Sequence, residues 1–173
     1  MRRVTLVLPV DGSNVLLAMK KKGFGMGQWN GFGGNVEDYD SSLEAAAVRE
    51  LKEESKLVAD PADLSEIADI SFYFTDHPEW NQRMLVYLLR KWAGEPVETD
   101  EMKPFWFHER LVPYRSMWLA DEGWMPLALR GDYVQAEVTY EGKGELISRF
   151  YFIQPEGHTM PKKIARRLMK IKR

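Results

Sequence analysis

The chain has 173 residues, 45% of them hydrophobic and 12% aromatic, which is enough for the core of one globular domain. It contains no cysteine, so disulfide bonds and thiolate metal sites are excluded. The formal net charge is −2, but residues 162–173 hold seven basic side chains and no acidic one, so the remainder is acidic and poorly suited to binding nucleic acid.

The N-terminal residues predict a β-hairpin followed by a glycine-rich loop. Residues 4–10 and 14–19 are apolar and β-branched, and "DGS" between them is a strong turn signal. The first apolar run is too short for a signal core or a membrane span, so we expect a cytoplasmic protein. Aromatic side chains stand among the glycines of residues 20–34, which favours a loop that lines a site.

An acidic helix is predicted next, because "SSLE" at 41–44 has the form of a capping box. Residues three and four apart are neighbours on a helix, so Glu50, Glu53 and Glu54 should place their carboxylates on one face. The adjacent apolar face consists of Ala47, Val48 and Leu51. Such clusters are usually solvated surface, yet crowded carboxylates repel one another unless a cation intervenes. The glycine-rich loop just ahead therefore favours a site for a divalent metal and phosphate.

The remaining chain is richer in strands than in helices. Strands are predicted at 64–77, 83–92 and 104–109, a helix at 120–131, and a closing hairpin at 132–153 that turns at 141–145. This pattern indicates an α+β fold with a mixed sheet. The scattered His77, His108 and His158 are interpreted as surface or strand-end residues.

The acidic segment resembles the Nudix box, whose usual form is G-x5-E-x7-R-E-(apolar)-x-E-E-x-G-(apolar). Here Gly34 is followed after five residues by Asp40 and, after eight more, by "RELKEESKL" at 49–57. Asp40 replaces a glutamate, the next spacer is one residue longer, and Lys56 replaces the glycine that ends the helix. A lysine held in a left-handed conformation there costs about 1 kcal/mol.

The likeness extends over residues 4–153 and is carried by "VLLAMKKKGFGMGQWNGFGG", "PVETDEMKPFWF" and "MWLADEGWMPLAL". These segments are similar to the MutT group of the Nudix family, which hydrolyses oxidised purine nucleoside triphosphates such as 8-oxo-dGTP. The resemblance implies a Nudix fold, with a mixed β-sheet sandwiched between α-helices over residues 1–160. It also implies Mg²⁺-dependent release of pyrophosphate and a nucleoside monophosphate, with Mn²⁺ as the alternative metal.

The resemblance assigns roles to individual residues. The implied metal ligands are Gly33, Glu50, Glu53, Glu54 and Glu101, and the joint candidates for the catalytic base are Glu50, Glu53 and Glu54. The implied substrate-binding residues are Thr5, Lys20, Phe24, Asn30, Phe32, Gly34, Asn35, Phe72, Trp118 and Asp121. Without the family, Thr5 and Phe72 would be ordinary strand residues. Trp80 and Asn81 stand in a segment that matches the family poorly and stay open as pocket candidates.

One departure concerns recognition of the base. The family has two adjacent aspartates where this chain has Ala120 and Asp121. A close acid pair can share a proton, so that one member donates while the other accepts. Since a lost hydrogen-bond partner in a buried site costs about 1–3 kcal/mol, we expect the reaction to be kept and the base preference to be narrowed or altered. Asp121 would then act alone, with water, or with Glu122.

Two other functions stay open, a Nudix pyrophosphohydrolase acting on general (d)NTPs or nucleotide sugars, and a non-catalytic nucleotide-binding module. We expect a monomer whose partner is a small nucleotide, with no stable nucleic-acid binding and no membrane span. The basic tail at 161–173 has Ile164, Leu168 and Ile171 at helical spacing. It is interpreted as a surface helix, with contact to an anionic membrane or nucleic acid, or disorder, as alternatives.

Overall fold

The computed structural model describes residues 1–153, so the predictions for His158 and for the basic tail at 161–173 lie outside the described residues. The strands are β1 (Arg2–Asp11), β2 (Asn14–Lys20), β3 (Trp29–Asn30), β4 (Leu64–Phe74), β5 (Gln82–Leu89), β6 (Met102–His108), β7 (Val134–Glu141) and β8 (Leu146–Phe152). The α-helices are α1 (Leu43–Ser55) and α2 (Asp121–Leu129), and four short 3-10 helices lie in the connections of the described chain. No helix within residues 1–153 is long and apolar enough to cross a membrane.

The strands form one mixed sheet in the order β3-β2-β1-β5-β4-β7-β8, and β6 pairs with β2. The β1–β5 and β4–β7 pairs are parallel, whereas β1–β2, β2–β3, β2–β6, β4–β5 and β7–β8 are antiparallel. The α+β class and the mixed sheet are therefore confirmed.

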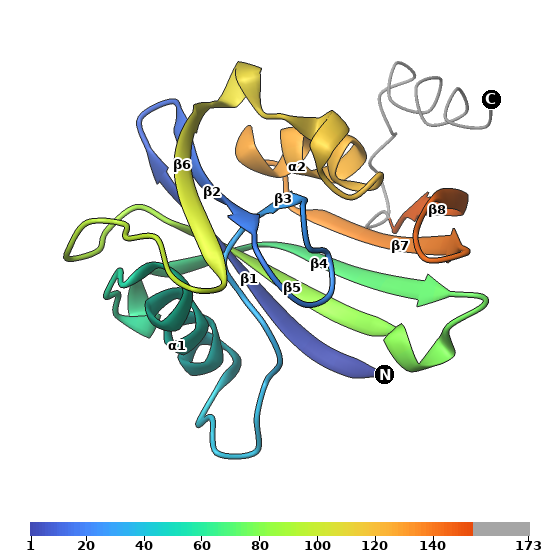
Figure 1. The fold of residues 1–173 in the computed structure, drawn as a ribbon, viewed down its shortest axis with the longest axis horizontal. Helices are drawn as coiled ribbons and strands as arrows, with labels where there is room; N and C mark the ends of the chain where they lie inside the picture. Colours follow the sequence, from blue (N-terminus) through green and yellow to red (C-terminus); the bar gives the residue numbers. More distant parts are fainter. Residues whose placement is uncertain (154–173) are drawn as a thin grey trace.

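The two helices cover opposite faces of the sheet, as Figure 1 shows. On one face Ala47 and Leu51 of α1 pack against Val7 and Tyr87 of the central strands. On the other face, α2 contributes Trp124 to a larger cluster that also contains residues of β1, β4, β5 and β7. The predicted sandwich of a sheet between helices is confirmed.

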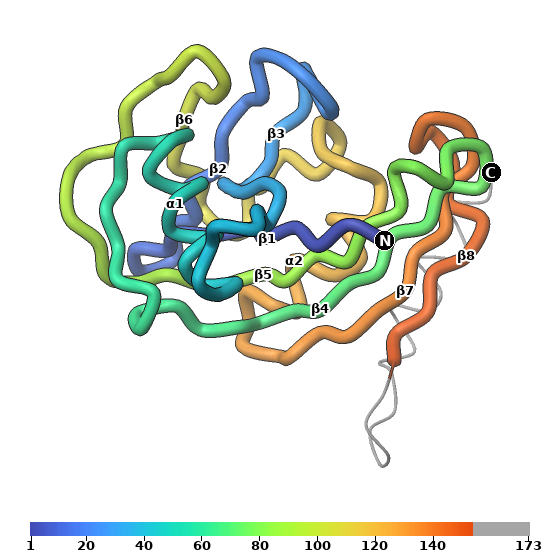
Figure 2. The backbone as a smooth tube through the Cα atoms, turned by 90° about the horizontal axis from the view of Figure 1, so that it is seen from below, coloured from blue at the N-terminus to red at the C-terminus, as the bar shows by residue number. Residues whose placement is uncertain are grey.

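The N-terminal hairpin opens soon after its turn. β1 and β2 pair only at Val10–Val15 and Asp11–Asn14. Farther along β1, the place of β2 is taken by residues 31–35, which form isolated bridges with β1. The loop that precedes this segment lies beside the chain that leads into α2 (Figures 1 and 2).

The N-terminus of α1 corrects the predicted capping box by one residue. Ser42 is the N-cap, and its Oγ accepts a hydrogen bond from the Ala45 N–H at 3.0 Å. Glu44 consequently lies one position too early to complete a box, and its carboxylate accepts instead from the Tyr87 hydroxyl at 3.4 Å. Ser41 and Ser42 are equivalent capping residues by composition, so only the backbone distinguishes them.

The buried face of α1 also differs from the prediction at one position. Ala46, Ala47 and Leu51 are fully buried, whereas Val48 is only partly buried and lines a shallow surface groove. The backbone phase of α1 therefore puts Ala46, and not Val48, into the core.

Lys56 ends α1 in the left-handed conformation, with φ 67°, and its N–H donates to the Lys52 carbonyl. This is the strained lysine that the box predicted. We expect Lys56→Gly to raise the free energy of unfolding by roughly 0.5–1 kcal/mol, because glycine adopts this conformation without a Cβ clash. Urea denaturation of both proteins measures the change, and a destabilised variant would contradict the strain.

Candidate active site

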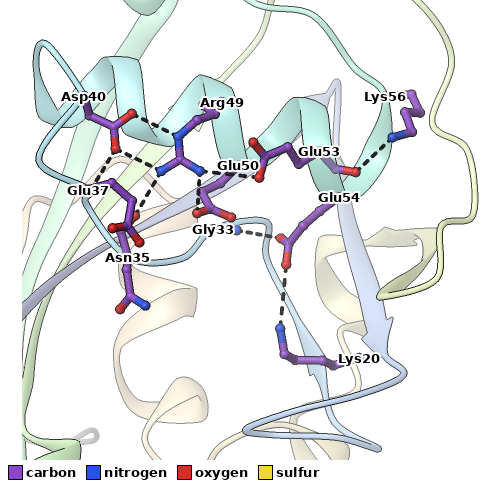
Figure 3. Close-up of polar contacts among 10 residues, drawn as sticks. All are labelled: Lys20, Gly33, Asn35, Glu37, Asp40, Arg49, Glu50, Glu53, Glu54 and Lys56. Atoms are coloured by element: carbon purple, nitrogen blue, oxygen red, sulfur yellow. Dashed lines mark hydrogen bonds and ion pairs between the residues drawn. The ribbon is translucent and has the colours of Figure 1, made fainter.

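The glycine segment and α1 meet at a buried carboxylate, shown in Figure 3. The Gly33 N–H donates to Oε2 of Glu54 at 2.8 Å, and Nζ of Lys20 lies 3.6 Å from Oε1. The Glu54 side chain is only 4% exposed. Burial raises the pKa of Glu54 to about 7, although the Gly33 N–H and the Lys20 ammonium act in the opposite direction. Glu54 is therefore poised between its charged and neutral forms near neutral pH.

Only glycine fits where this segment crosses β1. A Cβ on Gly33 would lie 1.9 Å from the backbone oxygen of Thr5, and a Cβ on Gly34 would lie 2.7 Å from the Glu50 carboxylate. The absence of side chains thus lets the segment approach β1 and α1 at the same time. This is the close backbone approach that a glycine-rich loop before an acidic helix indicates.

Arg49 ties the acidic residues together (Figure 3). Its Nε and Nη2 each donate to the Asp40 carboxylate at 2.9 Å, and its Nη1 donates to Glu50 at 2.8 Å and to Glu53 at 3.4 Å. The hydrogen bond from Arg49 lowers the pKa of Asp40. Although the box has Asp40 in place of a glutamate and a spacer that is one residue longer, a carboxylate still reaches Arg49.

The three glutamates do not share one environment. The Glu50 side chain is 16% exposed and beside Gly34, and burial raises its pKa despite the contact with Arg49. Glu53 is 60% exposed and lines the shallow groove on the outer side of α1. The prediction that three carboxylates share one face of α1 therefore holds for Glu50 and Glu54, whereas Glu53 is mostly exposed to solvent.

Glu101 reaches the same region from the loop before β6. Its side chain is 49% exposed and pairs with Lys22 at 3.2 Å. Thr99 links it to α1, since the Thr99 hydroxyl donates to the Glu54 carbonyl at 3.2 Å and accepts from the Glu101 N–H at 3.3 Å. The loop and the helix are thus held in a fixed relation.

The donor set suits a hard divalent cation. Within residues 1–153 no three acidic or histidine side chains converge in a way that could hold a metal ion. Mg²⁺, however, usually takes one or two protein carboxylates and completes its shell with water and substrate phosphates. Burial raises the pKa of Glu50 and of Glu54, so a cation placed beside them would stabilise their charged forms. The residues therefore fit the metal that the box implies.

A cavity of about 460 Å³ opens beside this carboxylate site. Most residues that the sequence assigned to substrate or metal line it, namely Thr5, Lys20, Phe24, Asn30, Gly33, Gly34, Asn35, Phe72, Glu101, Trp118 and Asp121. Glu50 and Glu54 lie beside the cavity, and neither they nor Glu53 are among its lining residues. Phe32 does not line it either, because its ring is fully buried in the core beneath α1. The Thr5 hydroxyl is buried and has no hydrogen-bond partner among residues 1–153, so it is available to a ligand.

Aromatic side chains form one part of the cavity wall. Trp118 stacks on Phe24 with ring centroids 4.9 Å apart, and a Cβ on Gly144 would meet the indole at 2.5 Å. Phe74 and Tyr140 also line the cavity, and their rings stack at 5.1 Å. The sequence reasoning missed these two residues, which their alternating strand positions alone do not distinguish from core.

Trp80 and Asn81, the open candidates, support this wall from behind. Trp80 packs edge-on against Phe24 at 5.2 Å, and the Asn81 side chain accepts from the Phe74 N–H at 2.7 Å. Of the two described histidines, His77 stacks on Trp80, and His108 ends β6. Neither lines the cavity, in agreement with the surface and strand-end interpretation.

Asp121 is the buried acid of this part of the cavity. Its carboxylate accepts from the Trp118 N–H at 3.2 Å and from Nε1 of Trp124 at 2.9 Å. Burial raises the pKa of Asp121 to about 7, and these two hydrogen bonds only partly offset the effect. A carboxyl that titrates near neutrality can either donate to a bound base or accept from it.

The raised pKa values make the stability of the metal-free protein depend on pH. Glu54 and Asp121 titrate near 7 when folded, compared with 4.5 and 3.8 as ordinary values, so the folded state binds more protons between these limits. We expect the free energy of unfolding in EDTA to fall by a few kcal/mol from about pH 5 to about pH 8. Urea denaturation across this range tests it, with Glu54→Gln and Asp121→Asn flattening the curve. Stability that rises over the range would contradict the assigned burial.

The chain is similar in sequence to proteins of known family. The family model for the NUDIX domain matches residues 1–128. The chain belongs to the Nudix family. Among curated Nudix relatives, the oxidized purine nucleoside triphosphate hydrolase of Danio rerio is 46% identical over 129 residues, covering 73% of this chain and 79% of that protein. The protein of the same name from Mus musculus is 42% identical, covering 75% of this chain and 80% of its own length.

Solved structures agree on the Nudix fold. The MutT protein of Bacillus halodurans superposes with a TM-score of 0.76 at 21% identity, covering 90% of this chain and all of that one. A MutT NUDIX hydrolase from Burkholderia pseudomallei gives a TM-score of 0.62 at 23% identity over 75% of this chain and 95% of its own. At these identities the likeness concerns the fold alone.

Proposed function

We propose that this Nudix protein hydrolyses oxidised purine (deoxy)nucleoside triphosphates such as 8-oxo-dGTP, releasing pyrophosphate and the nucleoside monophosphate. The observation that carries the proposal is the single cavity lined by Gly33, Lys20 and Glu101 beside the acidic helix and by Trp118 and Asp121 elsewhere. Charged groups suit a triphosphate, and an aromatic wall with a buried acid suits a purine. The names of the Danio rerio and Mus musculus relatives support the same substrate class.

In this proposal Glu50, Glu54 and Glu101, with the Gly33 carbonyl and Glu53, hold Mg²⁺, with Mn²⁺ as the alternative. The bound metal would lower the pKa of the attacking water and neutralise the leaving diphosphate. Lys20 pairs with Glu54 at 3.6 Å and can exchange that partner for a phosphate oxygen.

Glu50, Glu53 and Glu54 stay joint candidates for the proton acceptor, and Glu54 is the most buried of the three. In the metal-free protein burial raises the pKa of Glu54 to about 7, and a bound Mg²⁺ would lower this pKa and keep the carboxylate charged. The Gly33 N–H fixes Oε2 of Glu54, and Oε1 faces the Lys20 ammonium at 3.6 Å, so both carboxylate oxygens have a defined position. Arg49 keeps Glu50 in place through its contact at 2.8 Å.

The aromatic part of the cavity would take the base. Trp118 and Phe72 present flat surfaces, and stacking on one aromatic ring is worth roughly 1–3 kcal/mol whatever the base. Selectivity must therefore come from polar groups, of which Asn30 and Asp121 line the cavity. The Asn30 carboxamide oxygen accepts from the Gly31 N–H at 2.9 Å, which aims its NH₂ group away from this bond.

A nucleotide panel with Mg²⁺, scored by product identity, tests the proposal. We expect pyrophosphate and a monophosphate, with kcat/KM for 8-oxo-dGTP well above that for dGTP, and with 2-hydroxy-dATP and O6-methyl-dGTP distinguishing among modified bases. Equal efficiency on all normal and modified dNTPs would contradict a pocket that reads the base. Absence of turnover on every nucleotide would favour the non-catalytic alternative.

A Nudix pyrophosphohydrolase of other specificity is the second candidate. The observation that favours it is Ala120, a fully buried residue that cannot supply the second carboxyl of the family. General (d)NTPs and nucleotide sugars belong in the same panel for this reason.

The proposal extends to the setting of the enzyme. We infer a catalytic domain over residues 1–160, a monomer in the cytoplasm, and no stable binding of nucleic acid. Gel filtration with light scattering tests the monomer, and a mass near twice 20.1 kDa would contradict it.

A further inference from the structure

A tyrosine hydroxyl lies beside the place where the family has its first aspartate. The Ala120 N–H donates to Oη of Tyr140 at 3.2 Å, inside the protein. Ala120 is 0% exposed and Tyr140 is 1% exposed, yet the tyrosine lines the cavity. A side chain of β7 therefore places its hydroxyl beside Ala120, the residue that precedes Asp121.

The ring of Tyr140 is held on several sides. Its centroid lies 6.1 Å from that of Phe72, 5.1 Å from that of Phe74 and 6.0 Å from that of Trp118. Burial and the neighbouring charge of Asp121 raise the pKa of Tyr140, so the phenol keeps its proton throughout the physiological range. Tyr140 is thus a fixed side chain of the cavity wall, with its hydroxyl held at Ala120.

Hydrogen-bond accounting leaves the hydroxyl with one unused donor. Oη accepts from Ala120, and the hydrogen bonds within residues 1–153 include no acceptor for the Tyr140 hydroxyl hydrogen. A buried donor without a partner is unfavourable, so an acceptor on a bound ligand would be favoured there. The neighbouring carboxylate of Asp121 accepts from Trp118 and Trp124, and among residues 1–153 no hydrogen bond joins it to the Tyr140 hydroxyl.

We propose that Tyr140 is a specificity-determining residue, whose hydroxyl takes the place of the missing carboxyl and donates a hydrogen bond to a keto oxygen of the purine. This inference rests on the proposed function and adds a substrate class to it. An acid pair can move its proton and serve bases of both kinds, whereas the Tyr140 oxygen already accepts from the Ala120 N–H and its hydrogen is left to donate. Guanine-type bases present the 6-keto oxygen as an acceptor, while adenine-type bases present a 6-amino donor. In 8-oxo purines of both types N7 carries a hydrogen, so the 6-position is what distinguishes them. The pocket therefore selects oxidised 6-keto purines over oxidised 6-amino purines.

Tyr140→Phe tests the proposal with substrates that differ at the 6-position. 8-oxo-dGTP and 8-oxo-dITP have the 6-keto oxygen, and 8-oxo-dATP has the amino group; the inosine compound controls for the 2-amino group. We expect kcat/KM to fall roughly tenfold for both keto substrates and to change little for 8-oxo-dATP. Tyr87→Phe, which removes a buried hydroxyl beneath α1, is the matched control and should leave the keto-to-amino ratio unchanged.

A merely structural role gives a different result. If Tyr140→Phe lowers kcat/KM equally for all three substrates, or lowers it for none of them, the proposal is overturned. The double variant Tyr140→Phe/Ala120→Asp should regain an acid pair and accept 8-oxo-dATP and 8-oxo-dGTP more evenly; an unchanged ratio would count against the proposal.

Binding separates this inference from the proposed function. Calorimetry with 8-oxo-dGMP and 8-oxo-dAMP reports the keto preference without turnover, and Tyr140→Phe should reduce it by a similar factor. A wild-type protein that binds these products selectively but hydrolyses no triphosphate would overturn the proposed function and leave the role of Tyr140 standing. Equal binding of both products by the wild-type protein would overturn the role of Tyr140.

Discussion

Glu54→Gln should lower kcat for 8-oxo-dGTP by about 10²- to 10⁴-fold, the range that a positioned general base contributes. Glutamine keeps the shape of the side chain and an oxygen that can accept from the Gly33 N–H at 2.8 Å, so the fold should be retained. What is lost is the charge of a buried carboxylate that, in the proposal, holds Mg²⁺ and is a candidate for the proton acceptor. Pyrophosphate release with saturating Mg²⁺ measures the effect.

Glu44→Gln is the matched control on the same helix. Glu44 lies in the first turn of α1, outside the proposed metal site, and its carboxylate accepts from the Tyr87 hydroxyl at 3.4 Å, so its loss should leave kcat within about tenfold of the wild-type value. A variant at Glu44 that is as impaired as the one at Glu54 would show that the loss of rate comes from the helix and not from the site. A variant at Glu54 that is as active as the wild type would remove Glu54 from the proposed chemistry.

Gly33→Ala should damage both stability and turnover. The new Cβ would lie 1.9 Å from the Thr5 oxygen, which belongs to a central strand and cannot move aside alone. We expect a loss of at least about 1–3 kcal/mol in the free energy of unfolding from overpacking. The segment must also withdraw from Glu54, and a displacement of about 1 Å near reacting groups can cost about 100-fold in rate. Urea denaturation and pyrophosphate release measure the two effects.

Gly34→Ala is the control that tests a clash with a side chain in place of a clash with the backbone. Its Cβ would lie 2.7 Å from the Glu50 carboxylate, the end of a side chain that can shift by rotation. The stability loss should therefore be smaller than for Gly33→Ala, while activity falls because Glu50 is displaced. If the two alanine variants are equally stable, the backbone contact with Thr5 is not what requires glycine at position 33.

Local signals in the sequence predicted a large part of the fold. The turn "DGS", the helix that begins near residue 42 and the closing hairpin depend on neighbouring residues, and each appears in the structure close to its predicted bounds. The left-handed Lys56 was also predictable, because a helix end of this type requires φ > 0 whatever residue is present.

Contacts between distant segments could not be predicted in this way. The parallel pairing of β1 with β5 joins residues about 80 positions apart, and no local pattern encodes it. The same limit applies to Tyr140, which reaches the cavity only because β7 pairs with β4. Its approach to Ala120, the departure already visible in the sequence, is a property of tertiary packing.

The residues of the candidate site also show which features local sequence predicts and which depend on tertiary packing. Glu50 and Glu54 follow from helical spacing, but that spacing does not reveal that Glu53 is mostly exposed. Phe32 occurs in a motif with Asn30 and Gly33, yet the alternation of side chains along the bridge to Val7 turns its ring into the core. Resemblance identified the segment, and packing decided which of its side chains reach the cavity.

A crystal structure of Glu54→Gln with 8-oxo-dGTP and Mg²⁺ tests the central claim most directly. The expected result is a triphosphate and metal against Glu50 and the Gly33 segment, with the base against Trp118 and within hydrogen-bond distance of Asp121. A nucleotide bound outside the 460 Å³ cavity, or one whose base faces solvent while its phosphates avoid α1, would contradict the claim.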